Sequence, residues 1–373
     1  MKIIDSPHFP LPGSIKRILL IQLGDIGDVV WTTPTIRAVK HSLPGVSVSV
    51  LVKEGFGGLL EADPSVETVW EVRRPGGSFF AKASDPLRFI KQWRAASFDL
   101  AVDLRLGDRG AWMAFLSGAP VRITLNPRGG LPFWRRCLFT HGVEDRPPVS
   151  HRGAVDQSLR ILRPFGIDTD DVIPRLWVSE TVRNRVIQIL AERNLAGLSA
   201  WVSINPYSRW SYKEWSDARW LDLINWLWEE FSLPVVIIGS NQEREKAEAL
   251  SRQSRGRIFN FAGQTSLAEL AGLLALSRLH IGVDSAAPHI AAAVGTPTVT
   301  IYGPTSWRDW APPGPQHRVI TPDMDCAPCF HKGCNGEGYS LCLETLTTER
   351  IQPAIREALK ASGNTVLALK KDV

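Results

Sequence analysis

An acidic loop near the N-terminus is the first place in this chain where side chains could do chemistry. Asp28 follows an apolar run in the sequence QLGDIGDVVWTTP, and Gly24 before it permits a close approach of a ligand to the backbone. A carboxylate held at the end of a strand is well placed to act as a general base, so Asp28 is the candidate catalytic residue. The common alternative is that Asp28 only caps a helix. A second acid at Asp25, and a proline at Pro34 that should distort a helix beginning at Val29, weigh against a cap alone.

A second candidate site lies in residues 281–305, whose sequence is IGVDSAAPHIAAAVGTPTVTIYGPT. The pattern predicts a strand, a turn, an Ala-rich helix and another strand. The N-terminus of such a helix presents N–H groups and partial positive charge, which favours a phosphate or pyrophosphate ligand. The candidate residues for binding such a ligand are Asp284, Ser285, Ala286 and His289. Taken singly, Asp284 could equally be a helix cap and His289 a core histidine.

A basic cluster follows another predicted strand, in the sequence INPYSRWSYKEW. Ser208, Arg209 and Lys213, together with Ser211, form a compact set of donors suited to phosphate oxygens. An exposed lysine is usually only solvated, but the interleaved aromatic residues argue against a free surface loop. The two interpretations of Lys213 are evenly balanced.

Four of the five cysteines crowd together near the C-terminus, at Cys326, Cys329, Cys334 and Cys342. The first pair has the spacing of a zinc knuckle, and His331 could be a further ligand, so a structural zinc is one interpretation. The later spacings match no strong zinc template, which makes buried thiols an equal alternative. Two Asp-x-Asp pairs, at residues 168–170 and 323–325, do not end apolar strands, and we treat them as chance. We therefore expect no metal in the chemistry.

Alternating strand and helix patterns must position these groups. They run from Lys16 onward and are typical of a parallel sheet with crossover helices. Residues 126–150 interrupt the rhythm, an Asp-rich segment at 166–174 is a candidate linker, and a second alternating half follows. We expect an α/β protein of two Rossmann-like domains facing across a cleft, where ligands bind at the carboxyl ends of strands. The expected bounds are residues 1–175, residues 176–347, and a C-terminal helix and tail at 348–373 that could pack back on the first domain.

The composition excludes several classes of protein. The chain has 373 residues, 44% hydrophobic and 22% charged, which fits two folded domains and argues against disorder. A net charge of +5 without a basic stripe gives no nucleic-acid signature. No apolar run could span a bilayer and no secretory signal is recognisable, so we expect a cytoplasmic protein. An aromatic and basic cluster at residues 133–136 could lie on a headgroup surface, although we favour a buried aromatic beside solvated arginines.

The ordered set of motifs resembles the lipopolysaccharide heptosyltransferases, which are inverting glycosyltransferases of family 9 with the GT-B fold. The resemblance covers about residues 16–351 and, through GDRGAW and SRW…KEW, is closest to the heptosyltransferase III type. It rests on RILLIQLGDIGDVVWTTPTIRAVK, DLRLGDRGAWMAFLSGAPVRI, NPYSRWSYKEW, IGVDSAAPHIAAAVGTPTVTIYGPT and CAPCFHKGCN.

The resemblance implies transfer of a heptose from ADP-L-glycero-D-manno-heptose to the inner core of lipopolysaccharide, at the cytoplasmic face of the inner membrane. It implies that Asp28 is the base, that Lys213 and Asp284 bind the nucleotide sugar, and that no cofactor is required. The family's acceptor-binding residues are poorly fixed by motif, so Arg105 and Arg109 are expected only as contacts for acidic core sugars and phosphates.

Three alternatives remain at the level of the sequence. One is a transferase that uses another nucleotide sugar for a different surface glycan, and another is a non-catalytic nucleotide-sugar-binding protein of the same fold. A dinucleotide oxidoreductase has no support, because GDIGD stands where G-x-G-x-x-G would follow the first strand.

Overall fold

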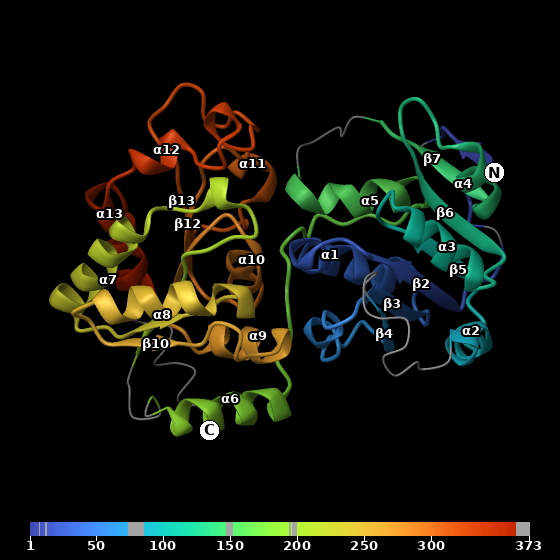
Figure 1. Ribbon diagram of the computed structural model, residues 1–373. Coiled ribbons are helices and arrows are strands. Elements are labelled where there is room, and N and C mark those ends of the chain that lie inside the picture. The colour runs from blue at the N-terminus through green and yellow to red at the C-terminus, as the bar shows by residue number, and fades with distance from the viewer. Residues whose placement is uncertain are drawn as a thin grey trace. The chain divides into compact units, whose positions relative to one another are not determined.

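The computed structural model describes residues 1–6, 8–11, 13–73, 86–146, 152–193, 195 and 200–362. The chain divides into two compact units, Met1–Trp177 and Val178–Val373. The sequence pattern placed the division at residue 175. Each unit is an α/β structure built on a parallel sheet (Figure 1).

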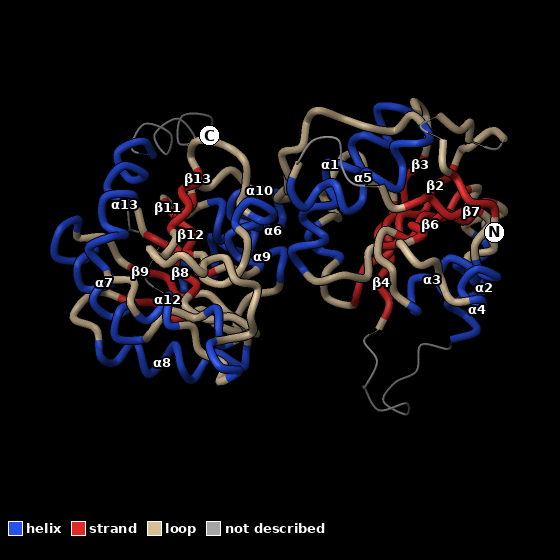
Figure 2. Tube along the Cα trace, turned by 90° about the horizontal axis from the view of Figure 1, so that it is seen from above, coloured by secondary structure: helices blue, strands red, loops and turns tan. Residues whose placement is uncertain are grey.

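The first unit holds a seven-stranded sheet with the strand order β1-β7-β6-β5-β2-β3-β4. Its strands are β1 (Lys2–Ile4), β2 (Arg17–Ile21), β3 (Ser47–Lys53), β4 (Thr68–Val72), β5 (Leu100–Asp103), β6 (Val121–Asn126) and β7 (His141–Glu144). Its helices are α1 (Ile26–Ser42), α2 (Pro86–Ala95), α3 (Asp108–Leu116), α4 (Phe133–Leu138) and α5 (Asp156–Leu162). Helices α1 and α5 cover one face of the sheet and α2, α3 and α4 the other (Figure 2).

The second unit holds a six-stranded sheet with the order β10-β9-β8-β11-β12-β13. Its strands are β8 (Val202–Asn205), β9 (Val235–Ile237), β10 (Ile258–Asn260), β11 (Leu279–Val283), β12 (Thr298–Ile301) and β13 (His317–Ile320). Its helices are α6 (Glu180–Glu192), α7 (Asp217–Phe231), α8 (Arg244–Gln253), α9 (Leu267–Ala275), α10 (Ala286–Ala293), α11 (Trp307–Trp310), α12 (Leu341–Glu344) and α13 (Thr348–Ser362).

Strand order is what positions the two candidate sites. In each unit the chain first builds the sheet outward in one direction and then returns to build on the other side of the starting strand. The point of reversal lies between β2 and β5 in the first unit and between β8 and β11 in the second. In open α/β sheets, ligands bind beyond the carboxyl ends of the strands at this reversal. The expected α/β fold of two Rossmann-like domains is thus confirmed, and each unit has one such binding edge.

Several features of the fold go beyond the sequence-based expectations. The segment 126–150, expected to be irregular, completes β6 and contains α4 and β7, and the N-terminal residues add β1 to β7. Helix α13 belongs to the second unit. Its buried residues Ile351, Ile355 and Leu359 join the core of the second unit, against α7 and the strands β11 to β13.

Pro34 was expected to distort its helix, yet α1 continues through it from Ile26 to Ser42. A proline at this position cannot donate to the carbonyl of Val30, four residues earlier. The Thr33 hydroxyl does so instead, with its Oγ1 2.9 Å from the Val30 carbonyl oxygen. The backbone group that proline leaves without a donor is therefore satisfied, and the helix is not interrupted.

No helix in the described part of the chain is both long and apolar enough to cross a membrane.

Candidate functional site

Asp28 is the third residue of α1, immediately beyond the carboxyl end of β2. Its Oδ2 accepts a hydrogen bond from the Asp25 backbone N–H at 2.7 Å, so one oxygen does cap the first turn of the helix. Gly24 makes this geometry possible, because a Cβ there would lie 2.3 Å from Asp28 Oδ2. The capping interpretation is therefore correct for one oxygen of the carboxylate.

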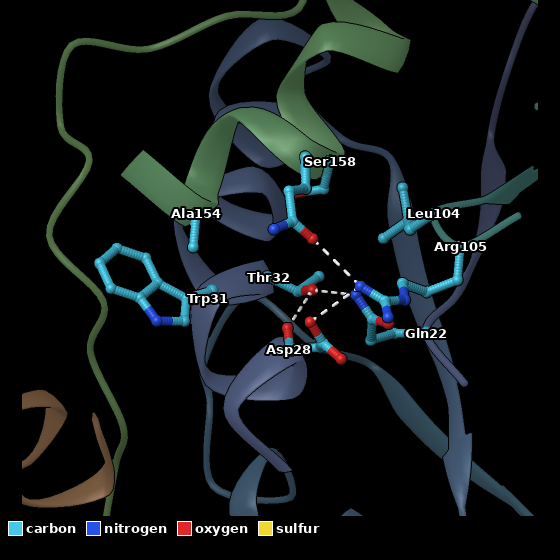
Figure 3. Close-up of a pocket in the computed structure, with 9 residues that line it drawn as sticks. Gln22, Asp28, Trp31, Thr32, Leu104, Arg105, Ala154 and Ser158 are labelled. Atoms are coloured by element: carbon cyan, nitrogen blue, oxygen red, sulfur yellow. Dashed lines mark hydrogen bonds and ion pairs between the residues drawn. The ribbon is translucent and has the colours of Figure 1, made fainter. Parts of the chain in front are cut away.

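The other oxygen of Asp28 faces an arginine from the neighbouring strand end. Arg105 follows β5, which pairs with β2, and its Nη1 donates to Asp28 Oδ1 at 3.0 Å. The same Nη1 donates to Gln157 Oε1 on α5, also at 3.0 Å. Figure 3 shows the Arg105 guanidinium directed at the Asp28 carboxylate. The carboxylate is thereby oriented through both of its oxygens.

This arrangement forms one wall of a small pocket. The pocket is lined by Gln22, Asp28, Trp31, Thr32, Leu104, Arg105, Ala154, Gln157 and Ser158. Gln22 donates from Nε2 to Thr32 Oγ1 at 2.7 Å, and Thr32 donates to the Asp28 carbonyl at 2.7 Å. The polar groups around the carboxylate are held in place by one another.

Burial raises the pKa of the Asp28 carboxyl above its ordinary value, and the positive charge of Arg105 and the Asp25 hydrogen bond oppose that rise. The Asp28 side chain is only 9% exposed, while that of Arg105 is 41% exposed. A carboxylate whose affinity for a proton is raised in this way is suited to general-base chemistry.

A second buried acid supports the loop that carries Arg105. Asp103 ends β5, and its Oδ1 accepts the Arg105 backbone N–H at 3.1 Å. Burial raises the pKa of Asp103 to about 8. Gly110 leaves room for this side chain, since a Cβ there would lie 2.4 Å from Asp103 Oδ1. Arg109, named with Arg105 as an acceptor contact, is half-buried in the first turn of α3, outside the residues that line the pocket.

In the second unit, Lys213 and Asp284 meet at the reversal between β8 and β11. The Lys213 Nζ lies 2.7 Å from Asp284 Oδ2, and the Thr305 hydroxyl donates to the same oxygen at 2.6 Å. Asp284 follows β11, Thr305 lies beyond the end of β12, and Lys213 closes a short helical turn after β8. The side chains of Lys213 and Asp284 are 19% and 7% exposed, so this is a largely buried ion pair.

Ser285 fixes the start of α10. Its hydroxyl donates to Asn205 Oδ1 at the end of β8, and Asn205 Nδ2 donates to the Tyr207 carbonyl at 3.1 Å. Because the hydroxyl is directed to Asn205, it does not cap α10, and Ala286 begins the helix. The N–H groups of the first turn give this end of the helix the character of an anion site.

His289 lies inside α10 and is buried. Burial lowers the pKa of its imidazole to about 4, although Asp284 favours the charged form. The ring is therefore neutral at physiological pH. The buried Tyr302 lies beside the same charges, and burial and Asp284 raise the pKa of its phenol. The sequence left open whether His289 is a core histidine or part of the binding site. In the structure it is a core histidine that lies next to the Lys213–Asp284 pair.

Ser208 and Arg209, predicted as donors together with Lys213, make contacts of another kind. The Ser208 N–H donates to Glu214 Oε1 at 3.0 Å, and the Arg209 guanidinium lies 5.3 Å from the centre of the Trp210 ring. Arg209 is exposed. Their role in binding stays a prediction.

The cysteine cluster does not support the predicted structural zinc. Among the described residues, no group of three or more His, Cys, Asp or Glu side chains is arranged to hold a metal ion. Cys342 is buried in the core of the second unit, where burial and the three other thiols raise its pKa to about 11. Cys334 Sγ accepts the Leu341 N–H at 3.4 Å. His331 is exposed.

Three residues of these sites were not singled out from the sequence: Gln157, Asn205 and Thr305. Asn205 and Thr305 each follow an apolar β-branched run, which is the signal that could have identified them. Gln157 gives no such signal, because its place in the helical sequence pattern is that of a solvent-exposed residue. It reaches the site only through the packing of α5 beside α1.

Residues 86–340 match the sequence profile of the family described as glycosyltransferase family 9 (heptosyltransferase). The chain is similar to lipopolysaccharide heptosyltransferase 3 of Escherichia coli, with 28% identity over 300 residues that cover 76% of this chain and 84% of the relative.

Two solved E. coli structures share the fold. One is the ADP-heptose lipopolysaccharide heptosyltransferase II, with a TM-score of 0.72 and 22% identity, covering 93% of this chain and 99% of the other. The second is a heptosyltransferase with ADP-2-deoxy-2-fluoro heptose, with a TM-score of 0.63 and 19% identity, covering 91% and 99%.

Proposed function

This chain belongs to glycosyltransferase family 9, the heptosyltransferase family, and we propose that it transfers a heptose from ADP-L-glycero-D-manno-heptose to the inner core of lipopolysaccharide with inversion at the anomeric carbon. The observation that carries the proposal is the buried Asp28 carboxylate in the pocket at the strand reversal of the first unit. The donor and the acceptor are suggested by the names of the similar proteins, which include ADP-heptose and lipopolysaccharide.

In the proposed mechanism Asp28 acts as the general base. Its Oδ2 is engaged by the Asp25 N–H, so Oδ1 is the atom that would accept the proton. A carboxylate oxygen has two lone-pair positions, and the bond from Arg105 leaves one for an acceptor hydroxyl. As the proton moves to Oδ1, the hydroxyl oxygen forms the bond to the anomeric carbon, and the bond from that carbon to the diphosphate breaks on the opposite face.

The donor site of the proposal is the Lys213–Asp284 edge of the second unit. The departing ADP takes the electron pair of the broken bond, so negative charge grows on its diphosphate. Lys213 and the N-terminus of α10 at Ser285 and Ala286 would stabilise that charge, while Asp284 would hold the nucleotide sugar. Arg105 and Arg109 would meet acidic groups of the acceptor.

The proposal also places the reaction at the cytoplasmic face of the inner membrane, where the chain would make peripheral contact. The acceptor is a lipid-anchored glycan, so the enzyme must work at a membrane surface.

A panel of donors and acceptors tests the proposed function. ADP-heptose, GDP-sugars and UDP-sugars would be offered with lipopolysaccharide cores truncated at successive sugars, and products identified by mass spectrometry and NMR. We expect turnover with ADP-heptose and a core that lacks one heptose, with an inverted linkage. Asp28→Asn, which keeps an acceptor for the Asp25 N–H, should lower kcat by about 10² to 10⁴. Asp25→Asn is the matched control and should retain most activity.

Each other outcome points to a different conclusion. Turnover with another nucleotide sugar would replace heptose as the substrate. Binding of ADP-heptose without turnover on any acceptor would favour a non-catalytic binding protein. Near-normal turnover of Asp28→Asn would remove Asp28 from the base role.

A further inference from the structure

The α3–α4 face of the first unit exposes an unusual number of large apolar side chains. We define this face by the exposed residues Leu106, Trp112, Phe115, Phe133 and Trp134. Phe133 is 81% exposed and Trp112 is 49% exposed. The sequence favoured a buried aromatic at this place, and the structure corrects that prediction. A burial role in this unit therefore does not account for these rings.

The rings of Trp112, Phe115 and Trp134 form one continuous cluster because α3 packs against α4. The Trp112 and Trp134 rings are stacked with centroids 6.1 Å apart, and Phe115 meets Trp112 edge-on at 6.4 Å. Segments more than twenty residues apart in sequence thus present their aromatic side chains together. Large exposed apolar patches of this kind mark a surface that binds something.

Arginines surround and support the same rings. The Arg135 guanidinium lies 5.5 Å from the centre of the Trp134 ring and pairs with Asp108, and the Arg122 guanidinium lies 5.7 Å from that of Phe115. Arg136 is exposed two residues after Trp134. The face therefore combines aromatic rings with fixed positive charge.

The charge of the face stands out from the rest of the chain. Residues 104–138 contain six arginines, one aspartate and no lysine or glutamate, a formal charge of +5. This equals the net charge of the whole chain, so the remaining residues balance to zero. The segment that carries the exposed aromatic rings therefore has a strong local excess of positive charge.

We propose that the α3–α4 face docks the protein on an anionic phospholipid bilayer. Tryptophan and phenylalanine partition into the headgroup region, while arginines pair with lipid phosphates, and both are needed for stable attachment of a protein without a spanning helix. A protein partner with an apolar surface would not require the positive charge of the arginines against these rings. The charge complementarity thus selects an anionic membrane.

The position of the α3–α4 face fits the proposed function. The use of this face in catalysis rests on that function. Leu106 on the face is the residue next to Arg105 in the pocket. A bilayer held against the face would present the sugars of a membrane-anchored acceptor near Asp28.

Vesicle binding by the full chain tests the proposal. Vesicles of phosphatidylcholine alone, or mixed with anionic phosphatidylglycerol, would be sedimented with the protein at low and high salt. We expect binding to the anionic vesicles that weakens with salt. Arg136→Glu should lower the partition coefficient at least about fivefold, the effect of one charge near such a surface. Phe133→Ser with Trp134→Ser should lower it by on the order of tenfold.

Matched controls use the exposed positions of α6 in the other unit. Ile187→Ser and Arg183→Glu make the same changes of polarity and charge there and should bind as wild type. Binding of wild type to neither vesicle, or equal binding by the α3–α4 variants, would overturn the proposal. A dimer of wild type that the aromatic variant loses, without vesicle binding, would make the face a self-association surface instead.

A transfer assay separates this inference from the proposed function. On a deacylated, soluble acceptor without vesicles, the α3–α4 variants should turn over as wild type does. If wild type itself shows no transfer, the proposed function fails, whereas the vesicle result still decides the membrane surface.

Discussion

In the proposed mechanism the side chain of Asp28 serves structure and chemistry at once. Its Oδ2 caps α1 through the Asp25 N–H, while Oδ1 faces the pocket and Arg105. Burial raises the pKa of this carboxyl and Arg105 opposes the rise, so the arginine keeps more of the base in its ionised form. In the proposed mechanism Arg105 therefore positions and tunes the base, in addition to its proposed contact with the acceptor.

Removing the charge of Arg105 should move the pH dependence of the reaction. A base is active when ionised, so kcat/KM falls as the pH drops through its pKa. Arg105→Gln takes away a charge that lowers the pKa of Asp28, so the acid limb of the pH profile should move to higher pH. Arg105→Lys keeps the charge and should move the limb less. If Arg105→Gln lowers the maximal kcat/KM but leaves the acid limb of the pH profile in place, Arg105 acts on the acceptor alone.

Lys213 permits a separate test of the donor site. Lys213→Met removes a charged hydrogen-bond donor from a largely buried position, and the affinity for ADP should fall by at least tenfold, as expected for a loss of about 1.5–3 kcal/mol. Lys360→Met, on the exposed side of α13, is the control. Isothermal titration calorimetry measures both affinities, with a thermal melt to verify folding. An unchanged titration by Lys213→Met would remove this residue from the donor site.

At the scale of elements, local chemistry explains most of what the sequence predicted. Apolar runs ended by glycine and acidic residues identified β2, β11 and the helices that follow them. The prediction failed for α1 at Pro34, because the compensating Thr33 hydroxyl is a detail of side-chain rotamer and not of pattern. It failed for β6 and β7 because their short strands, in a Pro-, Gly- and Arg-rich segment, are stabilised by pairing with neighbours distant in sequence.

The role of Thr33 in α1 can be measured by a double-mutant cycle. Thr33 also accepts the Arg175 N–H at 3.1 Å, so Thr33→Val leaves both partners unsatisfied and should lower the free energy of unfolding by about 1–3 kcal/mol. Pro34→Ala restores a backbone N–H for the Val30 carbonyl, and in that background the same change should cost less. Urea unfolding provides the four values. Equal costs in the two backgrounds would contradict the proposed compensation.

At the scale of the whole molecule, the two units carry buried titratable groups of opposite kinds. In the second unit, burial lowers the pKa of His289 and His317 to about 4 and that of His280 to about 3. In the first unit, burial raises the pKa of Asp103 to about 8. The units should therefore differ in how their stability depends on pH.

Acid should destabilise the second unit relative to the first. Below pH 6.5 these histidines bind protons in the unfolded chain but not in the folded unit. Their contribution to stability is therefore lost as the pH falls from about 6.5 toward about 4. The loss is about 1.4 kcal/mol per pH unit for each group. Asp103 acts in the opposite sense. It stays protonated in the folded unit up to about pH 8 but not in the unfolded chain, so acidification favours the fold.

Hydrogen exchange monitored by mass spectrometry at pH 7 and pH 5, corrected for intrinsic rates, resolves the two units. The opening free energy of β11 peptides should fall more than that of β5 peptides. Equal changes in both units would contradict the assignment of these groups.

The sequence by itself determined the class of fold, the loops that carry Asp28 and Asp284, and the family resemblance, because these depend on residues close together along the chain. Only the tertiary structure decided which groups meet. Arg105 reaches Asp28 across 77 residues and Lys213 reaches Asp284 across 71, since the order of parallel strands brings β5 beside β2 and β11 beside β8. It also decided that α13 joins the second unit and that Phe133 and Trp134 face outward. Burial depends on what packs above a side chain, and no local pattern specifies that.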